Sequence, residues 1–99
     1  MGINFVDQYS LLHFATGIIA YFWGISLTNY TIMHALFEFI ENTKFGMNII
    51  NTNFKGIWPG GKPHADSHIN SIGDTIFGML GWIIACIVDY YSTKYNLYK

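Results

Sequence analysis

Three apolar stretches, each interrupted by a few ionisable residues, set the pattern of this 99-residue chain. They are LLHFATGIIAYFWGISL over residues 11–27, YTIMHALFEFI over 30–40, and IGDTIFGMLGWIIACIVDYY over 72–91. With their polar flanks, they predict helices over about 8–28, 30–43 and 68–91. Because a helix of about 20 residues spans the core of a bilayer, we expect three transmembrane or membrane-embedded helices, of which the second is the shortest.

The connection over about residues 44–66 breaks this apolar pattern. Its sequence WPGGKPH places Pro59, Gly60, Gly61 and Pro63 close together, which favours turns. We expect one long surface loop that covers the helix ends. As an alternative, the second helix continues through Phe45 to Ile50, with Gly46 as a weak point.

Small residues predict how these helices pack. Thr16, Ala20 and Gly24 recur every four residues in the first stretch, and Gly81 and Ala85 do so in the third, with Gly78 nearby. Such spacing lets helix backbones approach closely in lipid. The expected fold is therefore an all-α integral membrane bundle, one domain over 1–99.

Composition supports the membrane assignment. Apolar residues make up 52% of the chain and charged residues only 11%, against about 25% charged residues in soluble domains. Lipid covers such a surface more readily than water does. The net charge of −1, without a basic patch, excludes nucleic acid as an expected partner.

Each predicted helix carries its polar residues on a single face, at spacings of three or four. In chain order they are His13 on the first helix; His34, Glu38 and Glu41, followed by Asn42, on the second; and Asp66, Asn70 and Asp74 on the third.

The up-down-up order of three helices brings these faces together. His13 begins the first helix, Glu38 and Glu41 end the second, and Asp74 begins the third, so all of them lie towards one side of the membrane. Ionisable groups in membrane segments usually face the bundle interior or a wet cavity. We therefore predict one polar cup, open to that side and covered by the loop.

Each of these residues has an ordinary explanation beside a functional one. His13 could ligate a metal or carry a proton, or it could simply pair with a carboxylate. Glu38 and Glu41 would repel each other unless a cation or a shared proton intervenes, although Glu41 could be solvated and Glu38 could pair with a histidine. Asp74 could be a ligand or an acid, or it could be favoured by the helix dipole.

The remaining candidates are less central. Asn70 and Ser71 could bind substrate or merely cap and pack their helix. His64 and His68 flank Asp66 in an HxDxH pattern. They are outlying candidates, because histidines in loops are commonly solvated.

Carboxylates and imidazoles together suit Zn, Mg, Mn or Fe, and the absence of cysteine ligands disfavours a structural zinc site. We predict a divalent metal held by His13, Glu38, Glu41 and Asp74, of which the three acids are also the predicted catalytic residues. The predicted supporting or substrate-binding residues are His34, Asn42, Asp66, Asn70 and Ser71.

Three stretches together, DQYSLLHFATG, FEFIENTKF and DSHINSIGDTIFGMLGW, resemble a bacterial family of small integral membrane proteins that forms a conserved domain of unknown function. A fainter similarity reaches the VanZ-like membrane proteins. The family motifs fall on three groups of positions: Asp7, Tyr9, Ser10, His13 and Gly17; Glu38, Glu41 and Asn42; and Asp66, Ser67, Asn70, Ser71 and Asp74. The resemblance implies a small membrane protein and supplies no reaction.

The leading functional prediction is a multi-pass membrane protein whose polar site acts on a lipid or a lipid-linked head group, as a hydrolase or a head-group transferase. The alternative is a non-catalytic accessory or assembly subunit of a larger membrane complex. Homo-oligomerisation is compatible with both. A proton or ion path ranks last, because only Asp89 and Ser26 supply polar groups at the opposite side. Lysines at 44, 55 and 62, against 94 and 99, favour a cytoplasmic polar side.

Overall fold

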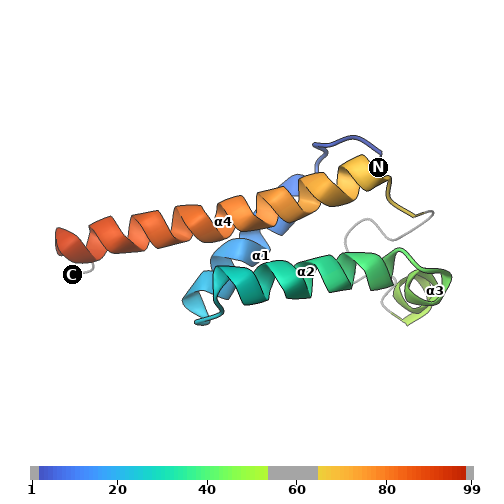
Figure 1. Ribbon diagram of the computed structural model, residues 1–99, viewed down its shortest axis with the longest axis horizontal. Helices are drawn as coiled ribbons and strands as arrows, with labels where there is room; N and C mark the ends of the chain where they lie inside the picture. Colours follow the sequence, from blue (N-terminus) through green and yellow to red (C-terminus); the bar gives the residue numbers. More distant parts are fainter. Residues whose placement is uncertain (1–2, 54–64, 98–99) are drawn as a thin grey trace.

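The computed structural model describes residues 3–53 and 65–97, and over these residues the chain is all-helical (Figure 1). The helices are α1 (Ser10–Phe22), α2 (Leu27–Glu41), α3 (Lys44–Asn53) and α4 (His68–Lys94). The predicted all-α class is confirmed for this part of the chain. The glycine- and proline-rich turn at 59–63, predicted to cover the site, lies outside the described residues.

The first predicted helix ends six residues too late, because the sequence holds a stop signal inside it. Gly24 adopts a left-handed conformation, with φ 80°. The amide of Gly24 donates to the Tyr21 carbonyl and that of Ile25 to the Ala20 carbonyl. These two bonds form a Schellman motif, which closes the end of α1. The prediction that Gly24 belongs to the packing face of this helix is therefore wrong.

Serine hydroxyls define where the next helices begin. Ser26 accepts a hydrogen bond from the Asn29 amide at 3.1 Å and caps α2, which starts at Leu27 rather than at residue 30. Ser67 accepts from the Asn70 amide at 3.1 Å and caps α4 at the predicted start. Both serines satisfy amides that the helix itself leaves without partners.

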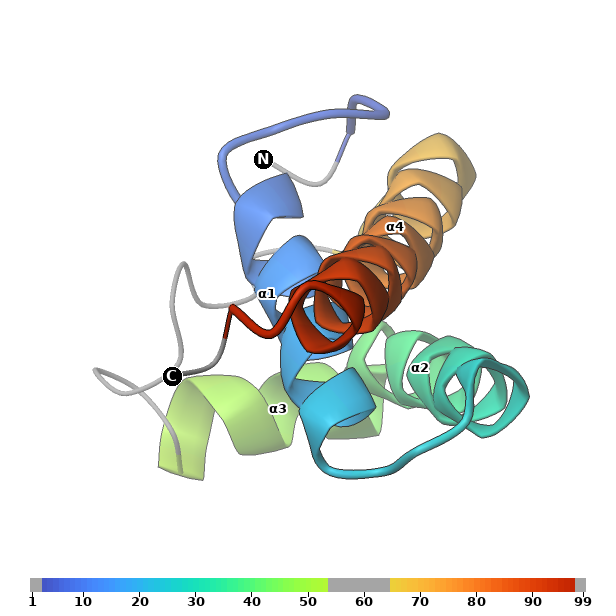
Figure 2. The same cartoon turned by 90° about the vertical axis from the view of Figure 1, so that its left-hand side faces the viewer.

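Helix α3 occupies residues that were predicted to lie in the loop. The Thr43 hydroxyl accepts from the Gly46 amide at 3.1 Å, which starts a new helix directly after α2. Gly46 lies so close to the Ile40 carbonyl that a Cβ there would collide with it. Ile50 is buried one turn later. Figures 1 and 2 show α3 running across the end of α2.

Glycines hold α1 and α4 in backbone contact. A Cβ at Gly17 would collide with the Gly78 carbonyl, and a Cβ at Gly81 would collide with the Phe14 carbonyl. Ala20 and Ala85 are buried in the same bundle. The predicted close packing of small residues is thus confirmed for Gly78, Gly81, Ala20 and Ala85.

The described part of the bundle buries polar groups and exposes apolar ones. Apart from Tyr30 and Ile50, no large apolar side chain among the described residues is buried. The buried polar side chains are Ser10, His34, Glu38, Glu41, Asn70 and Asp74. The large apolar side chains of α4 at positions 72, 76, 80, 84, 87 and 88 are all exposed. This distribution reverses the arrangement of a water-soluble domain.

Within the described residues, α4 alone is long and apolar enough to cross a membrane. Its 27 residues extend about 40 Å. Helices α1 and α2, with 13 and 15 residues, extend only about 20 and 22 Å. Length and composition therefore support one candidate span rather than three.

Candidate metal centre

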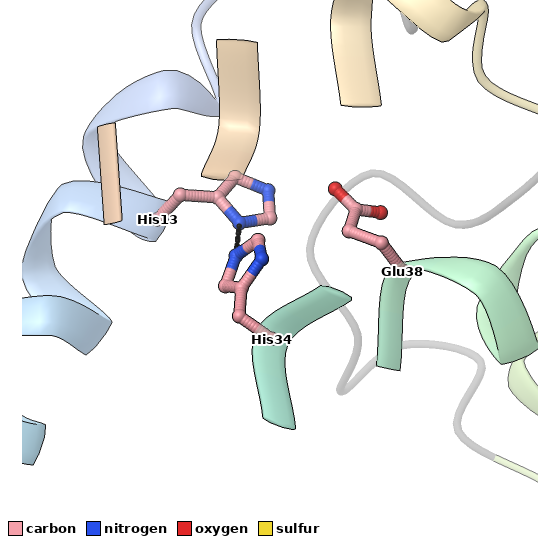
Figure 3. A group of neighbouring side chains, drawn as sticks. All are labelled: His13, His34 and Glu38. Atoms are coloured by element: carbon pink, nitrogen blue, oxygen red, sulfur yellow. Dashed lines mark hydrogen bonds between the residues drawn. The ribbon is translucent and has the colours of Figure 1, made fainter. Parts of the chain in front are cut away.

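Side chains from three helices meet at one end of the bundle. His13 comes from the first turn of α1, His34 and Glu38 from α2, and Asp74 from the second turn of α4. Figure 3 shows the two imidazole rings in contact and the Glu38 carboxylate pointing towards the His13 ring. The predicted convergence of the polar faces is therefore present in the structure.

His13 links the other two helices through both ring nitrogens. Its Nδ1 lies 2.9 Å from His34 Nε2, and its Nε2 lies 3.2 Å from Asp74 Oδ2. A proton or a cation must lie between the two imidazole nitrogens, because two bare lone pairs at this distance would repel. If His13 donates from Nε2 to Asp74, its Nδ1 accepts from His34.

His34 is more central than the supporting role predicted for it. It is buried, and its Nδ1 lies 3.4 Å from the Thr75 hydroxyl. Its ring also contacts Tyr30, whose hydroxyl bonds to Thr16 at 2.7 Å. Thr75 and Tyr30 were not predicted, because a threonine that bonds its own helix and a tyrosine on an apolar face carry no distinctive sequence signal.

Two carboxylates in this cluster have unsatisfied oxygens. The relative solvent-accessible area is only 4% for Glu38 and 3% for Asp74. Glu38 Oε1 and Asp74 Oδ1 are fully buried, and neither has a hydrogen-bond partner. A buried anionic oxygen without a partner costs several kcal/mol in principle, so these atoms call for a proton or a cation. Glu41 is buried beside Glu38 and interacts with its carboxyl group.

Asn42 ties the end of α2 to the start of α4. Its Nδ2 donates to the Glu38 carbonyl at 2.7 Å and to Glu38 Oε2 at 3.3 Å. Its Oδ1 accepts from the Asp66 amide at 2.8 Å. The Asn42 side chain therefore contacts two of the acidic residues, Glu38 and Asp66.

Asn70, predicted as a supporting or substrate-binding residue, bonds to the N-terminal segment. It is the most deeply buried large side chain among the described residues, and its Nδ2 donates to the Asn4 carbonyl at 2.7 Å and to Asp7 Oδ2 at 3.1 Å. Ser67 adds a bond from its hydroxyl to the Ile3 carbonyl at 2.6 Å. These bonds fasten the N-terminal segment against α4. Ser71 contributes its carbonyl, which accepts from Thr75.

The donors form two overlapping triads. One comprises His13, His34 and Glu38, and the other comprises Glu38, Asp66 and Asp74; within each, the ligand atoms lie within 4.8 Å of one another. Two imidazoles with one carboxylate form a ligand set of catalytic zinc and non-haem iron sites. Asp66 thus lies among the potential ligands rather than behind them.

The nitrogens of the first triad require little movement to bind a metal. Two ligands on one tetrahedral zinc, with bonds of about 2.0–2.1 Å, lie about 3.3 Å apart. His13 Nδ1 and His34 Nε2 are 2.9 Å apart. A small separation of the rings would therefore admit the ion in place of the shared proton.

Of the two outlying histidines, the structure describes His68, and this residue is not part of the cluster. His68 is exposed at the start of α4 and belongs to neither triad. His64 lies outside the described residues.

Comparison of the chain with known protein families, curated proteins and solved structures finds no match.

Proposed function

We propose that this chain is a membrane-embedded metalloprotein whose polar interior binds a divalent cation and acts on a lipid head group. The observation that carries the proposal is the meeting of His13, His34, Glu38 and Asp74 inside a bundle whose exterior is apolar. In this proposal α4 crosses the bilayer, and α1 and α2 form a hairpin embedded beside it.

The spacing of two aspartates along α4 supports a site that lies at the depth of the lipid head groups. Asp74 and Asp89 are separated by about 22 Å along α4, and a bilayer core is about 30 Å thick. If α4 crosses the membrane, both carboxylates therefore lie near the ends of the apolar core. The exposed residues Tyr90, Tyr91 and Tyr95 at the Asp89 end resemble an interfacial aromatic belt.

The donor set supports divalent metal chemistry. A cation between the imidazoles and carboxylates would satisfy the buried oxygens of Glu38 and Asp74. It would supply a Lewis acid for an ester or phosphoryl oxygen. We assign Glu41, which lies beside Glu38, the role of general base for the attacking water or hydroxyl group. The reaction class is then hydrolysis or transfer of a head group.

Head-group release from proteoliposomes tests this activity. The full chain is reconstituted with mixed phosphatidylethanolamine, phosphatidylcholine and phosphatidylglycerol, and released head groups are measured by mass spectrometry with Zn²⁺ or Mn²⁺. We expect release that EDTA abolishes and that Glu38→Gln and Glu41→Gln reduce by at least 100-fold. Asp89→Asn, an acid-to-amide change at the other end of α4, should retain activity. Equal release by wild type and Glu41→Gln would exclude the assigned base.

A non-catalytic accessory subunit is the second candidate, and one observation favours it. The C-terminal part of α4 extends past α1 (Figure 1) and exposes Ile84, Ile87 and Val88, which a second membrane protein could cover. In that case the chain co-purifies with a fixed partner after mild detergent extraction. Glu38→Gln would then lower stability without altering any head-group chemistry.

A further inference from the structure

We infer that the site holds two divalent cations bridged by the Glu38 carboxylate, an inference that rests on the metal binding proposed above. His13 and His34 would hold the first cation and Asp66 and Asp74 the second. The inference is based on the position of Glu38, which belongs to both triads of potential ligands.

Glu38 lies where a bridging ligand would lie, and one of its carboxylate oxygens has no hydrogen-bond partner. It lies on α2 and is the residue that the two triads share, and the triads also touch where His13 Nε2 lies 3.2 Å from Asp74 Oδ2. Only 4% of the area of Glu38 is exposed, its Oε1 has no hydrogen-bond partner, and its Oε2 accepts a long bond of 3.3 Å from Asn42. The Glu41 and Asp74 carboxyl groups lie beside it. In two-metal sites the ions lie about 3.5–4 Å apart, a separation that one bidentate carboxylate can bridge.

Asp74, whose carboxyl group lies beside that of Glu38, adds a second unsatisfied oxygen to the cluster. One of its oxygens meets His13 Nε2 at 3.2 Å, whereas the other, Oδ1, is buried and has no partner. A single cation in the histidine triad leaves Asp74 Oδ1 unsatisfied, because Asp74 belongs only to the other triad. A second cation satisfies it.

The charge of the cluster agrees with two cations. Glu38, Glu41, Asp66 and Asp74 together carry four negative charges when ionised. Among the described lysines, Lys44 is exposed at the start of α3 and Lys94 lies at the opposite end of α4. Two divalent cations neutralise four carboxylates, which lowers the cost of burying them.

This arrangement refines the reaction class. Two bridged cations stabilise both the attacking and the leaving oxygen in an in-line displacement at phosphorus. The substrate class that fits best is therefore a phosphate ester or diphosphate at head-group depth. The transfer breaks the phosphorus–oxygen bond to the leaving alcohol or phosphate and forms one to water or an acceptor hydroxyl. The proton of the attacking group passes to Glu41, which returns it to the leaving oxygen.

Electron paramagnetic resonance of the Mn²⁺-loaded protein tests the inference. The full chain in detergent is freed of metal, titrated with Mn²⁺, and its bound Mn²⁺ counted by elemental analysis. We expect two Mn²⁺ per wild-type chain with an exchange-coupled spectrum. His34→Gln and Asp66→Asn should each bind one Mn²⁺ and give the spectrum of an isolated ion. Asp89→Asn, remote from the cluster, should match wild type and controls for folding.

The wild-type result distinguishes the two-cation inference from the proposal that the protein binds metal. One Mn²⁺ per chain with an isolated-ion spectrum overturns the two-cation inference and leaves the metal proposal standing. Two uncoupled ions overturn the bridging role of Glu38. No bound Mn²⁺, Zn²⁺ or Fe²⁺ in a folded wild-type chain overturns the metal proposal as well.

Discussion

At the scale of single residues, helical spacing identified most of the polar cluster. Glu38 and Asp74 could be predicted to share a site because each ends or begins a helix at the same side. The sequence could not predict that His34 lies among the potential metal ligands, because it does not show which neighbour a ring faces across a helix interface. The partner of Asn70 was missed for the same reason, since an N-terminal segment packed on α4 leaves no periodic signal.

The Asn42 side chain should tune metal affinity without forming part of the metal site. Asn42→Ala removes its bonds to Glu38 and to the Asp66 amide, so we expect Zn²⁺ affinity to fall about 10–100-fold, as for other outer-shell partners. Isothermal titration of the metal-free protein measures this change. Asn29→Ala, at an exposed position of the same helix, is the matched control. An unchanged affinity for Asn42→Ala would remove Asn42 from the account.

At the scale of helices, the type of most elements could be predicted, whereas most of their first and last residues could not. The start of α4 was correct because Ser67 is a strong cap before an apolar run. The end of α1 was missed because Gly24 was interpreted as a packing residue rather than as a left-handed helix stop. Helix α3 was missed because few of its residues are apolar, and its formation depends on the Thr43 cap and on contact with α2.

The close contact of α1 and α4 should not tolerate even one methyl group. Gly81→Ala would place a Cβ against the Phe14 carbonyl, and overpacking of this kind costs about 1–3 kcal/mol. We expect a lower midpoint of thermal unfolding in detergent, followed by circular dichroism. Ala15→Leu, at an exposed position of α1, should leave the midpoint nearly unchanged. Equal midpoints for wild type and Gly81→Ala would show that the helices can separate freely.

At the scale of the whole molecule, composition predicted the inverted distribution of polar and apolar side chains. A chain with 11% charged residues cannot cover itself with charge, and four of its ionisable side chains, His34, Glu38, Glu41 and Asp74, are buried instead. The number of spans could not be settled by composition, because hydropathy along the sequence ignores helix stops. Among the helices of residues 3–53 and 65–97, only α4 has the length to cross alone.

If α4 crosses the membrane, its two ends must face opposite compartments. Single cysteines introduced as His68→Cys and Tyr95→Cys, in a Cys86→Ser background, occupy exposed positions near the two ends of the helix. We expect an impermeant maleimide to label only one of them in sealed vesicles and both after permeabilisation. Labelling of both in sealed vesicles would contradict a spanning α4.

The metal content of the purified protein shows whether the buried polar cluster holds a divalent metal. The wild-type chain and Glu38→Gln, with Asp89→Asn as the control, are purified in detergent from cells grown with trace Zn, Mn and Fe and analysed by inductively coupled plasma mass spectrometry. We predict at least one divalent ion per wild-type and Asp89→Asn chain, and at least a tenfold loss for Glu38→Gln. Folded wild-type protein with no more metal than Glu38→Gln would contradict the account.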